Sequence, residues 1–131
     1  MGIAHHRLLI CSKIAKRMYG MPEVLAPAKD LTAIEGIDVA PITGDITYYH
    51  ILMDKHEILI AEGAPAESLY LGTQTLHAIT PAARTELRLI FGNGWDHFIE
   101  SPVSARLLVS GQKARNMAGR HRKNNQPALT L

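Results

Sequence analysis

The sequence predicts a mainly β fold that is followed by two C-terminal helices. The strongest observation is Ile46–Gly72, where a segment rich in β-branched and aromatic residues and an aliphatic segment flank a short polar reversal. Other apolar runs of strand length are separated by Gly or Pro, a pattern typical of β sandwiches and barrels. After Gly72 the apolar residues change to helical spacing, which places the helices near the end of the chain.

Three short strands are expected before the central hairpin, at Arg7–Cys11, Glu23–Pro27 and Ile37–Ile42. A basic segment after the first strand is predicted to turn briefly helical, because its apolar residues can share one face before Gly20 and Pro22 end it. The stretch Ala28–Leu31 predicts a turn or a single helical turn.

The central hairpin is predicted to consist of two strands joined by a reversal at Asp54–His56. Both strands carry apolar residues on both faces, which is expected for strands inside a sheet rather than at its edge. A short reversal would place His50 and His56 on neighbouring strands, with Asp54 and Glu57 nearby. This group is the densest set of titratable side chains on an apolar background in the sequence.

Two helices are predicted in the last third of the chain. Thr80 is the expected N-cap, with Pro81 at the first helical position, and Gly92 is expected to end the helix. Ser110 is expected to cap the last helix. The apolar stripe of the first helix is Ala83, Leu87, Ile90 and Phe91, and that of the second is Ala114, Met117, Ala118 and His121.

The composition is that of an ordinary globular protein, with 131 residues, 47% hydrophobic and 20% charged residues. We expect a β domain over 1–79, a helical extension over 80–123 packed on it, and a tail over 124–131. The single cysteine excludes an internal disulfide. No run approaches the roughly 20 apolar residues of a membrane-spanning helix, and no secretory signal is visible, so we expect no membrane partner and a cytoplasmic location.

The hairpin carries a specific resemblance. The run Tyr48–Gly63, followed by Glu67 and Ser68, resembles the late part of the bacterial hedgehog/intein (Hint) domain. The segments His6–Ile10 and Val24–Leu31 resemble strands of the same family, and the chain from Ala105 to Arg122 resembles the tail that often follows such domains. The resemblance implies a Hint-like, partial β fold. It also implies chemistry related to protein splicing and autoproteolysis, in which a peptide bond is rearranged to a thioester or ester.

The resemblance implies a set of candidate catalytic residues, which are His6, His50, Asp54 and His56. The family's histidine at the position of His6, or of His5 if the alignment slips by one residue, protonates the departing amine. The family's nucleophile is a Cys or Ser at the first residue of the domain, before that histidine. Cys11 follows the histidine and does not match this position, and Ile3 stands where the family usually has Ser or Thr.

We therefore expect the rear part of a Hint domain, truncated and inactive alone in the N–S or N–O acyl shift of its relatives, so that whether it is an enzyme stays open. The expected partner is its own precursor chain or a complementary N-terminal fragment, and no cofactor is expected. A sheet without its first strands has an open edge, so homo-oligomers formed by strand exchange are also expected.

Two alternatives remain from the residues themselves. His50, Asp54 and His56 could bind zinc or iron in a small metal-dependent hydrolase, although their spacing is no known ligand signature and a metal is not expected. The second alternative is a binding module that contacts nucleic acid or a protein partner through the basic last helix. A solvated helix face is the more common explanation for such charges, and stacking aromatics are lacking there, so nucleic acid is not the expected partner.

Overall fold

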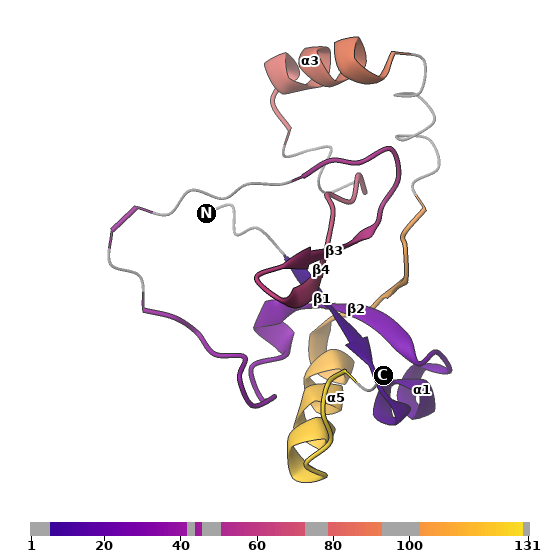
Figure 1. Ribbon diagram of the computed structural model, residues 1–131, viewed down its shortest axis with the longest axis vertical. Helices are drawn as coiled ribbons and strands as arrows, with labels where there is room; N and C mark the ends of the chain where they lie inside the picture. The colour runs from indigo at the N-terminus through magenta and orange to yellow at the C-terminus, as the bar shows by residue number, and fades with distance from the viewer. Residues whose placement is uncertain (1–5, 42–43, 46–50, 73–78, 93–102, 130–131) are drawn as a thin grey trace.

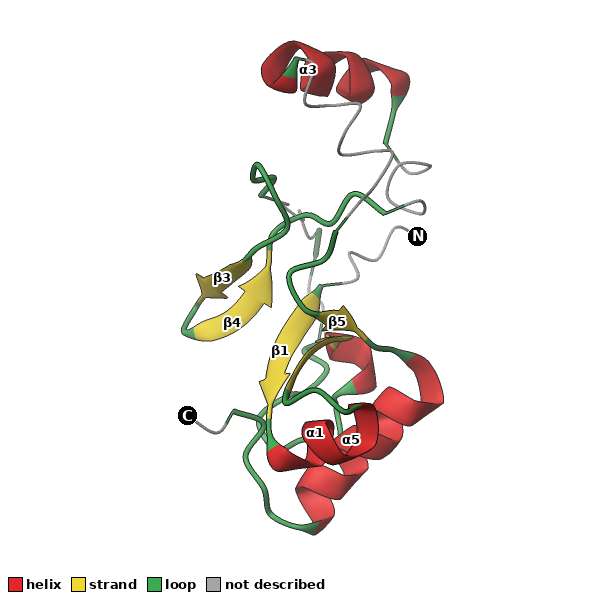
Figure 2. Cartoon of the chain, turned by 90° about the vertical axis from the view of Figure 1, so that its right-hand side faces the viewer, coloured by secondary structure: helices red, strands yellow, loops and turns green. Residues whose placement is uncertain are grey.

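The computed structural model describes residues 6–41, 44–45, 51–72, 79–92 and 103–129 of the chain. Its centre is one five-stranded sheet with the strand order β3-β4-β1-β2-β5 (Figures 1 and 2). Neighbouring strands are antiparallel except for β2 and β5, which are parallel. The strands are β1 Arg7–Cys11, β2 Glu23–Pro27, β3 Ile58–Ala61, β4 Ala64–Glu67 and β5 Leu107–Leu108.

The described helices are α1, α3, α5 and the 3₁₀ turn η1. Helices α1 and α5 lie together at one end of the molecule, and α3 lies at the opposite end (Figure 1). Among the described residues, every helix falls short of the length and apolar character that crossing a bilayer requires. The helices are α1 Lys13–Tyr19, η1 Ala28–Asp30, α3 Pro81–Phe91 and α5 Gly111–Lys123.

The unit β1-α1-β2 forms where the sequence predicts it, and both strands have the predicted bounds. The Ser12 side chain caps α1 by accepting a hydrogen bond from the Ala15 N–H at 3.1 Å. The helix ends at Gly20, whose φ of 78° lies in the left-handed region that glycine adopts without strain. This short helix reverses the chain, so β2 pairs with β1 over five residue pairs, from Arg7 opposite Pro27 to Cys11 opposite Glu23.

The core lies between the sheet and the helices α1 and α5. Its apolar residues come from β1, α1, β2, the segment after η1 and α5. The predicted stripe of the last helix, Ala114, Met117, Ala118 and His121, is buried along its whole length. Residues that are at most 1% exposed include Ile10, Ala15, Val24, Leu25, Ala26, Leu31, Met117 and His121. Burial of this aliphatic surface is the main driving force for docking α5 on the sheet.

Two polar side chains, His121 and Asp30, fix α5 in place. His121 Nδ1 donates to the Met117 carbonyl at 2.8 Å, so Nε2 accepts the Ser12 hydroxyl at 2.8 Å. At the other end of α5, the buried Asp30 carboxylate accepts from the Gly111 N–H at 3.0 Å and from Arg115 at 3.1 Å. Asp30 therefore caps the helix from outside, whereas the predicted cap, Ser110, stands at the N-cap position without a capping side-chain bond.

The central hairpin differs from the prediction. The chain reverses at Glu62 and Gly63, between β3 and β4, and not at Asp54–His56. Both turn residues have positive φ, 51° and 80°, which is the geometry that a two-residue hairpin turn requires. Residues 51–53 form no strand, and 46–50 lie outside the described residues. Strand β3 is also at the edge of the sheet, where Ile60 is 73% exposed, so the predicted interior position is wrong.

The predicted strand Ile37–Ile42 is absent over residues 37–41, and Ile42 lies outside the described part. The chain turns there instead, because the Ile37 N–H donates to the Ile34 carbonyl at 3.1 Å and Gly36 has a φ of 91°. Local turn bonds therefore replace the strand pairing.

Helix α3 has the predicted ends, with the Thr80 side chain accepting from the Ala83 N–H at 3.2 Å and Gly92 at the C-terminus. It contains no buried residue, and Leu89 and Ile90 are 82% and 65% exposed. The division of the chain into 1–79, 80–123 and 124–131 remains a prediction.

Replacing Ser12 with alanine should destabilise the protein by about 2 kcal/mol, because it removes the α1 cap and leaves the buried His121 Nε2 without its donor. Thr80→Ala is the matched control, since it removes a helix cap of the same kind from an exposed helix. We expect a loss of less than about 1 kcal/mol there. Urea unfolding followed by circular dichroism measures both, and equal losses in the two variants would contradict the role of Ser12.

Candidate functional site

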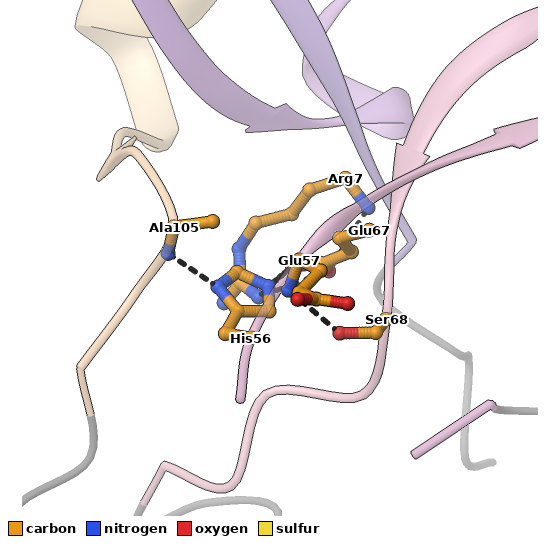
Figure 3. Close-up of polar contacts among 6 residues, drawn as sticks. All are labelled: Arg7, His56, Glu57, Glu67, Ser68 and Ala105. Carbon is orange, nitrogen blue, oxygen red and sulfur yellow. Dashed lines mark hydrogen bonds and ion pairs between the residues drawn. The ribbon is translucent and has the colours of Figure 1, made fainter. Parts of the chain in front are cut away.

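The carboxylate of Glu67 is the centre of a buried polar cluster at the meeting point of β1 and β4 (Figure 3). Arg7 Nη1 donates to both carboxylate oxygens at 3.1 Å, and the Arg7 backbone N–H donates to Oε1 at 3.2 Å. His56 Nε2 donates to Oε2 at 2.7 Å. The Glu67 side chain is only 7% exposed, so its charge is compensated by these donors rather than by water.

Strand register explains why Arg7 and Glu67 meet. Leu8 pairs with Ala66, so one step along each antiparallel strand brings Arg7 next to Glu67. Strand β4 ends at Glu67. The Glu67 carboxylate accepts the hydrogen bond from the Arg7 N–H, in the place of a backbone carbonyl that a longer strand would supply. The side chain therefore continues the sheet pairing and holds an ion pair at the same point.

Two segments outside regular strands bring His56 to the cluster. The Ser68 hydroxyl accepts from the Glu57 N–H at 2.9 Å, and the Ser68 N–H donates to the Glu57 carbonyl, also at 2.9 Å. The Leu69 N–H donates to the Ile51 carbonyl at 2.7 Å. These bonds align residues 51–57 with residues 68 and 69, which follow β4, and they place His56 beside Glu67 (Figure 3).

The hydrogen bonds assign one tautomer to His56. The Ala105 N–H donates to Nδ1 at 2.9 Å, so Nδ1 carries no proton and Nε2 is the nitrogen that donates to Glu67. The imidazole is 2% exposed and lies 5.0 Å from the Tyr70 ring. His56 is thus the contact that joins the segment at Ala105 to the sheet.

The cluster lowers the pKa of Glu67. Burial of the carboxyl would raise this pKa, but the hydrogen bond from His56 and the charge and hydrogen bonds of Arg7 outweigh that effect, and the net shift is downward from the ordinary value of 4.5. Glu67 is therefore an anion at neutral pH. It acts here as a fixed negative charge and hydrogen-bond acceptor, not as a proton donor.

His6, the residue just before β1, is held through its backbone. Its carbonyl accepts from the Ala28 N–H at 2.9 Å, and the next amide, the Arg7 N–H, donates to Glu67. The peptide plane between His6 and Arg7 is thus bonded on both sides. The residue is partly buried. A histidine on a peptide fixed in this way can present its ring in a reproducible position.

The other predicted site residues do not join this cluster. His50 lies outside the described residues. Asp54 is exposed. It was expected to lie near His56, but the hydrogen bonds of the His56 ring go to Glu67 and Ala105. In the described part of the chain, no three His, Cys, Asp or Glu side chains are grouped so that they could hold a metal ion. Both ring nitrogens of His56 are already bonded, which leaves neither free for a metal.

His56, Glu67 and Ser68 stand out in the sequence, but no sequence pattern connects them with Arg7, Tyr70 or Ala105. Arg7 gave a weak signal, as a basic residue directly beside His6, one of the candidate catalytic residues. Ala105 gave none, because its contribution is a backbone N–H. A wide hollow of about 630 Å³ opens beside this contact, lined by Lys55 to Ile58 and Val103 to Arg106.

Glu67→Gln should lower the free energy of unfolding by about 2 kcal/mol at pH 7, because a neutral amide loses the ion pair with Arg7 and cannot accept on both sides. The folded-state pKa of Glu67 is lowered, so its stabilising effect is complete above about pH 4.5 and is lost as the pH falls through the folded value. The stability difference between wild type and variant should therefore shrink on acidification. Chemical unfolding at a series of pH values measures it.

Glu57→Gln is the matched control for this titration. Among the described residues, the ion pair of the Glu57 carboxylate is the one with the exposed Lys55 at 4.0 Å, and such surface pairs contribute little stability. Its unfolding curve should follow that of the wild type across the same pH range. The free energies of unfolding of the wild type and Glu67→Gln could also differ by the same amount down to low pH. That result would show that the Glu67 charge is not the stabilising element.

The comparisons with known proteins agree with the resemblance seen in the sequence. The model of the family described as Hint domain matches residues 4–73, which is more than half of the chain and includes His6, Arg7, His56 and Glu67. No curated protein and no solved structure matches the chain significantly. The sheet with its accompanying helices is consistent with a partial Hint-like fold. The chain therefore belongs to the Hint domain family.

Proposed function

We propose that this chain supplies the acid–base and positioning part of a self-processing reaction, an N–S or N–O acyl shift. A Cys or Ser from another segment of the precursor, or from a complementary fragment, provides the nucleophile. The observation that carries the proposal is the fixed peptide plane between His6 and Arg7, bonded on one side by Ala28 and on the other by Glu67. It occurs at the residue that matches the family's catalytic histidine.

In the proposed step, the thiol or hydroxyl attacks the carbonyl carbon of the peptide bond before it. The C–S or C–O bond forms, the C–N bond breaks, and the proton lost by the nucleophile is balanced by the proton that the amine nitrogen gains. His6 delivers the proton to that nitrogen, a role suited to imidazole because its ordinary pKa lies near neutrality. No redox partner or cofactor is needed.

Within this proposal, Glu67 and His56 act as positioning residues. Glu67 holds the Arg7 amide and so fixes the backbone that carries His6. His56 is buried and bonded at both ring nitrogens, which suits a fixed donor to Glu67 better than a reacting base or a metal ligand. The alternative of a metal-dependent hydrolase has no support from this arrangement.

The position of Cys11 supports an external nucleophile. Cys11 ends β1, five residues after His6, and a strand advances about 3.3 Å per residue, so the two residues are roughly 16 Å apart along the strand. A histidine that protonates the departing amine has to lie within hydrogen-bond distance of it. Cys11 is therefore too far along the strand to serve as the nucleophile for His6.

The test mixes the purified chain with a fragment that carries the nucleophile-bearing N-terminal strands of an intact Hint domain, under reducing conditions. We expect a cleaved or spliced product in the mass spectrum, and none from the chain alone. His6→Ala should abolish the product, whereas His5→Ala, the matched control one residue earlier, should retain it. No product from the wild-type mixture, or the same rate from His6→Ala, would rule out the proposed reaction.

A further inference from the structure

Helices α1 and α5 together form a basic surface at one end of the molecule, and we propose that it binds the phosphate backbone of nucleic acid without reading the base sequence. This inference is independent of the proposed processing reaction, because none of its residues belongs to the Glu67 cluster. The six exposed residues of this two-helix basic surface are Lys13, Lys16, Arg17, Lys113, Arg120 and Lys123.

The two helices pack side by side in antiparallel directions. The start of α1 lies against the end of α5, where the Ser12 hydroxyl meets His121 Nε2 at 2.8 Å. The end of α1 lies against the start of α5, where Lys113 Nζ stands 4.5 Å from the centre of the Tyr19 ring. Figures 1 and 2 show both helices at the end of the molecule away from α3. Charges far apart in the sequence thus become neighbours.

The basic residues of α1 point away from the core. Ile14 and Ala15 are its buried residues. Lys13, Lys16 and Arg17 are spaced i, i+3 and i+4, so they share one face, and that face is opposite to the buried one. All three are exposed.

The basic residues of α5 continue this surface across the helix pair. Lys113 and Arg120 are seven residues apart and therefore lie on the same side of α5, the side that meets Tyr19 of α1. Lys123 follows on the outward face, opposite the buried stripe. Arg115 lies on the other side, where it is bound to Asp30. The surface thus runs from α1 over to the end of α5.

The charges of this surface are not neutralised within the described part of the chain. Neither helix contains Asp or Glu, and none of the six residues forms an ion pair with a described acidic side chain. A basic residue in the last turn of a helix stabilises the helix dipole, which favours the four charges of Lys16, Arg17, Arg120 and Lys123 where they stand. Lys13 and Lys113 are in first turns, where the dipole disfavours a positive charge. The helix dipole does not explain these two charges. Lys113 contacts the Tyr19 ring, and neither lysine is paired with a described carboxylate, so both can also meet an anionic ligand.

The surrounding surface favours nucleic acid over a membrane. A helix that inserts into a lipid surface needs an exposed apolar face, whereas the apolar stripe of α5 is fully occupied by the core. The ring of Tyr19 is covered by Lys113 and is not available for base stacking. Lysine and arginine contacts to phosphate remain, and these carry no sequence information. The basic residues of α5 alone form a narrow surface. The packing of α1 beside α5 makes the basic surface wide enough to contact several phosphates.

The probe is a short duplex DNA of random sequence, and binding is followed by fluorescence anisotropy at several salt concentrations. With up to six phosphate contacts, the logarithm of the binding constant should fall with the logarithm of salt concentration with a slope of about −5. Duplexes of different sequence should bind equally. No binding at about 50 mM salt, or a strong preference for one sequence, would overturn the proposal.

The variant Lys16→Ala with Lys113→Ala removes one charge from each helix, and its slope should be smaller by about two. The matched control is Arg84→Ala with Arg88→Ala, which removes two exposed charges from α3 at the far end of the molecule. Circular dichroism confirms that both variants fold. An equal loss of affinity in both would show that net charge alone drives binding, and would overturn the assignment of the surface.

Binding to vesicles that contain anionic phosphatidylserine tests whether the basic surface prefers a lipid surface to nucleic acid. The proposal expects binding to DNA at salt concentrations at which the vesicles no longer retain the protein. Retention by vesicles that exceeds DNA binding and depends on Lys16 and Lys113 would assign the surface to lipid and reject nucleic acid.

Discussion

The structure around the site depends on one buried negative charge. The Glu67 carboxylate loses nearly all contact with water, a large cost that is met only because four hydrogen bonds from Arg7 and His56 reach its two oxygens. The donors come from the start of β1 and from the segment before β3. A single side chain therefore holds together three parts of the chain that local structure would leave separate.

Two histidines connect the C-terminal part of the chain to this sheet, and the bonds assign them opposite tautomers. His56 receives the Ala105 N–H at Nδ1, whereas His121 donates from Nδ1 to the Met117 carbonyl and accepts Ser12 at Nε2. The family match ends at residue 73, yet Ala105 and α5 complete the cluster and the core. The last part of the described chain is therefore integrated with the Hint-like sheet.

Elements governed by local signals could be predicted from the sequence. Both β1 and β2 have the predicted bounds, and α3 begins at Thr80 and Pro81 as its capping residues indicate. The hairpin could not be placed, because the polar run Asp54–His56 is the expected reversal, whereas the chain turns at Glu62 and Gly63, which both adopt positive φ. The presence of Pro65 also hides β4, since proline disfavours strands.

Only those site residues whose side chains are titratable or hydrogen-bonding could be predicted from the sequence. His6 and His56 stand out in sequence, and Glu67 and Ser68 follow the hairpin motif, but their partners depend on register. The contact between Arg7 and Glu67 follows from the pairing of Leu8 with Ala66. Arg7 and Glu67 are 60 positions apart in the sequence, so no local pattern contains this contact. The Ala105 contact uses a backbone N–H, a group that every residue except proline has.

Strand β1 links the two ends of the molecule that we assign to different tasks. Its first residue, Arg7, bonds Glu67, and the residue after its last, Ser12, bonds His121. All five residues of β1 pair with β2, which makes β1 stiff. The strand therefore fixes the distance between the Glu67 cluster and the α1–α5 helix pair, and it has one arrangement in the sheet. Coupling between two sites needs an element with two states of similar energy. Binding at α1 and α5 should therefore locate the domain on a polyanion and leave the geometry at His6 unchanged.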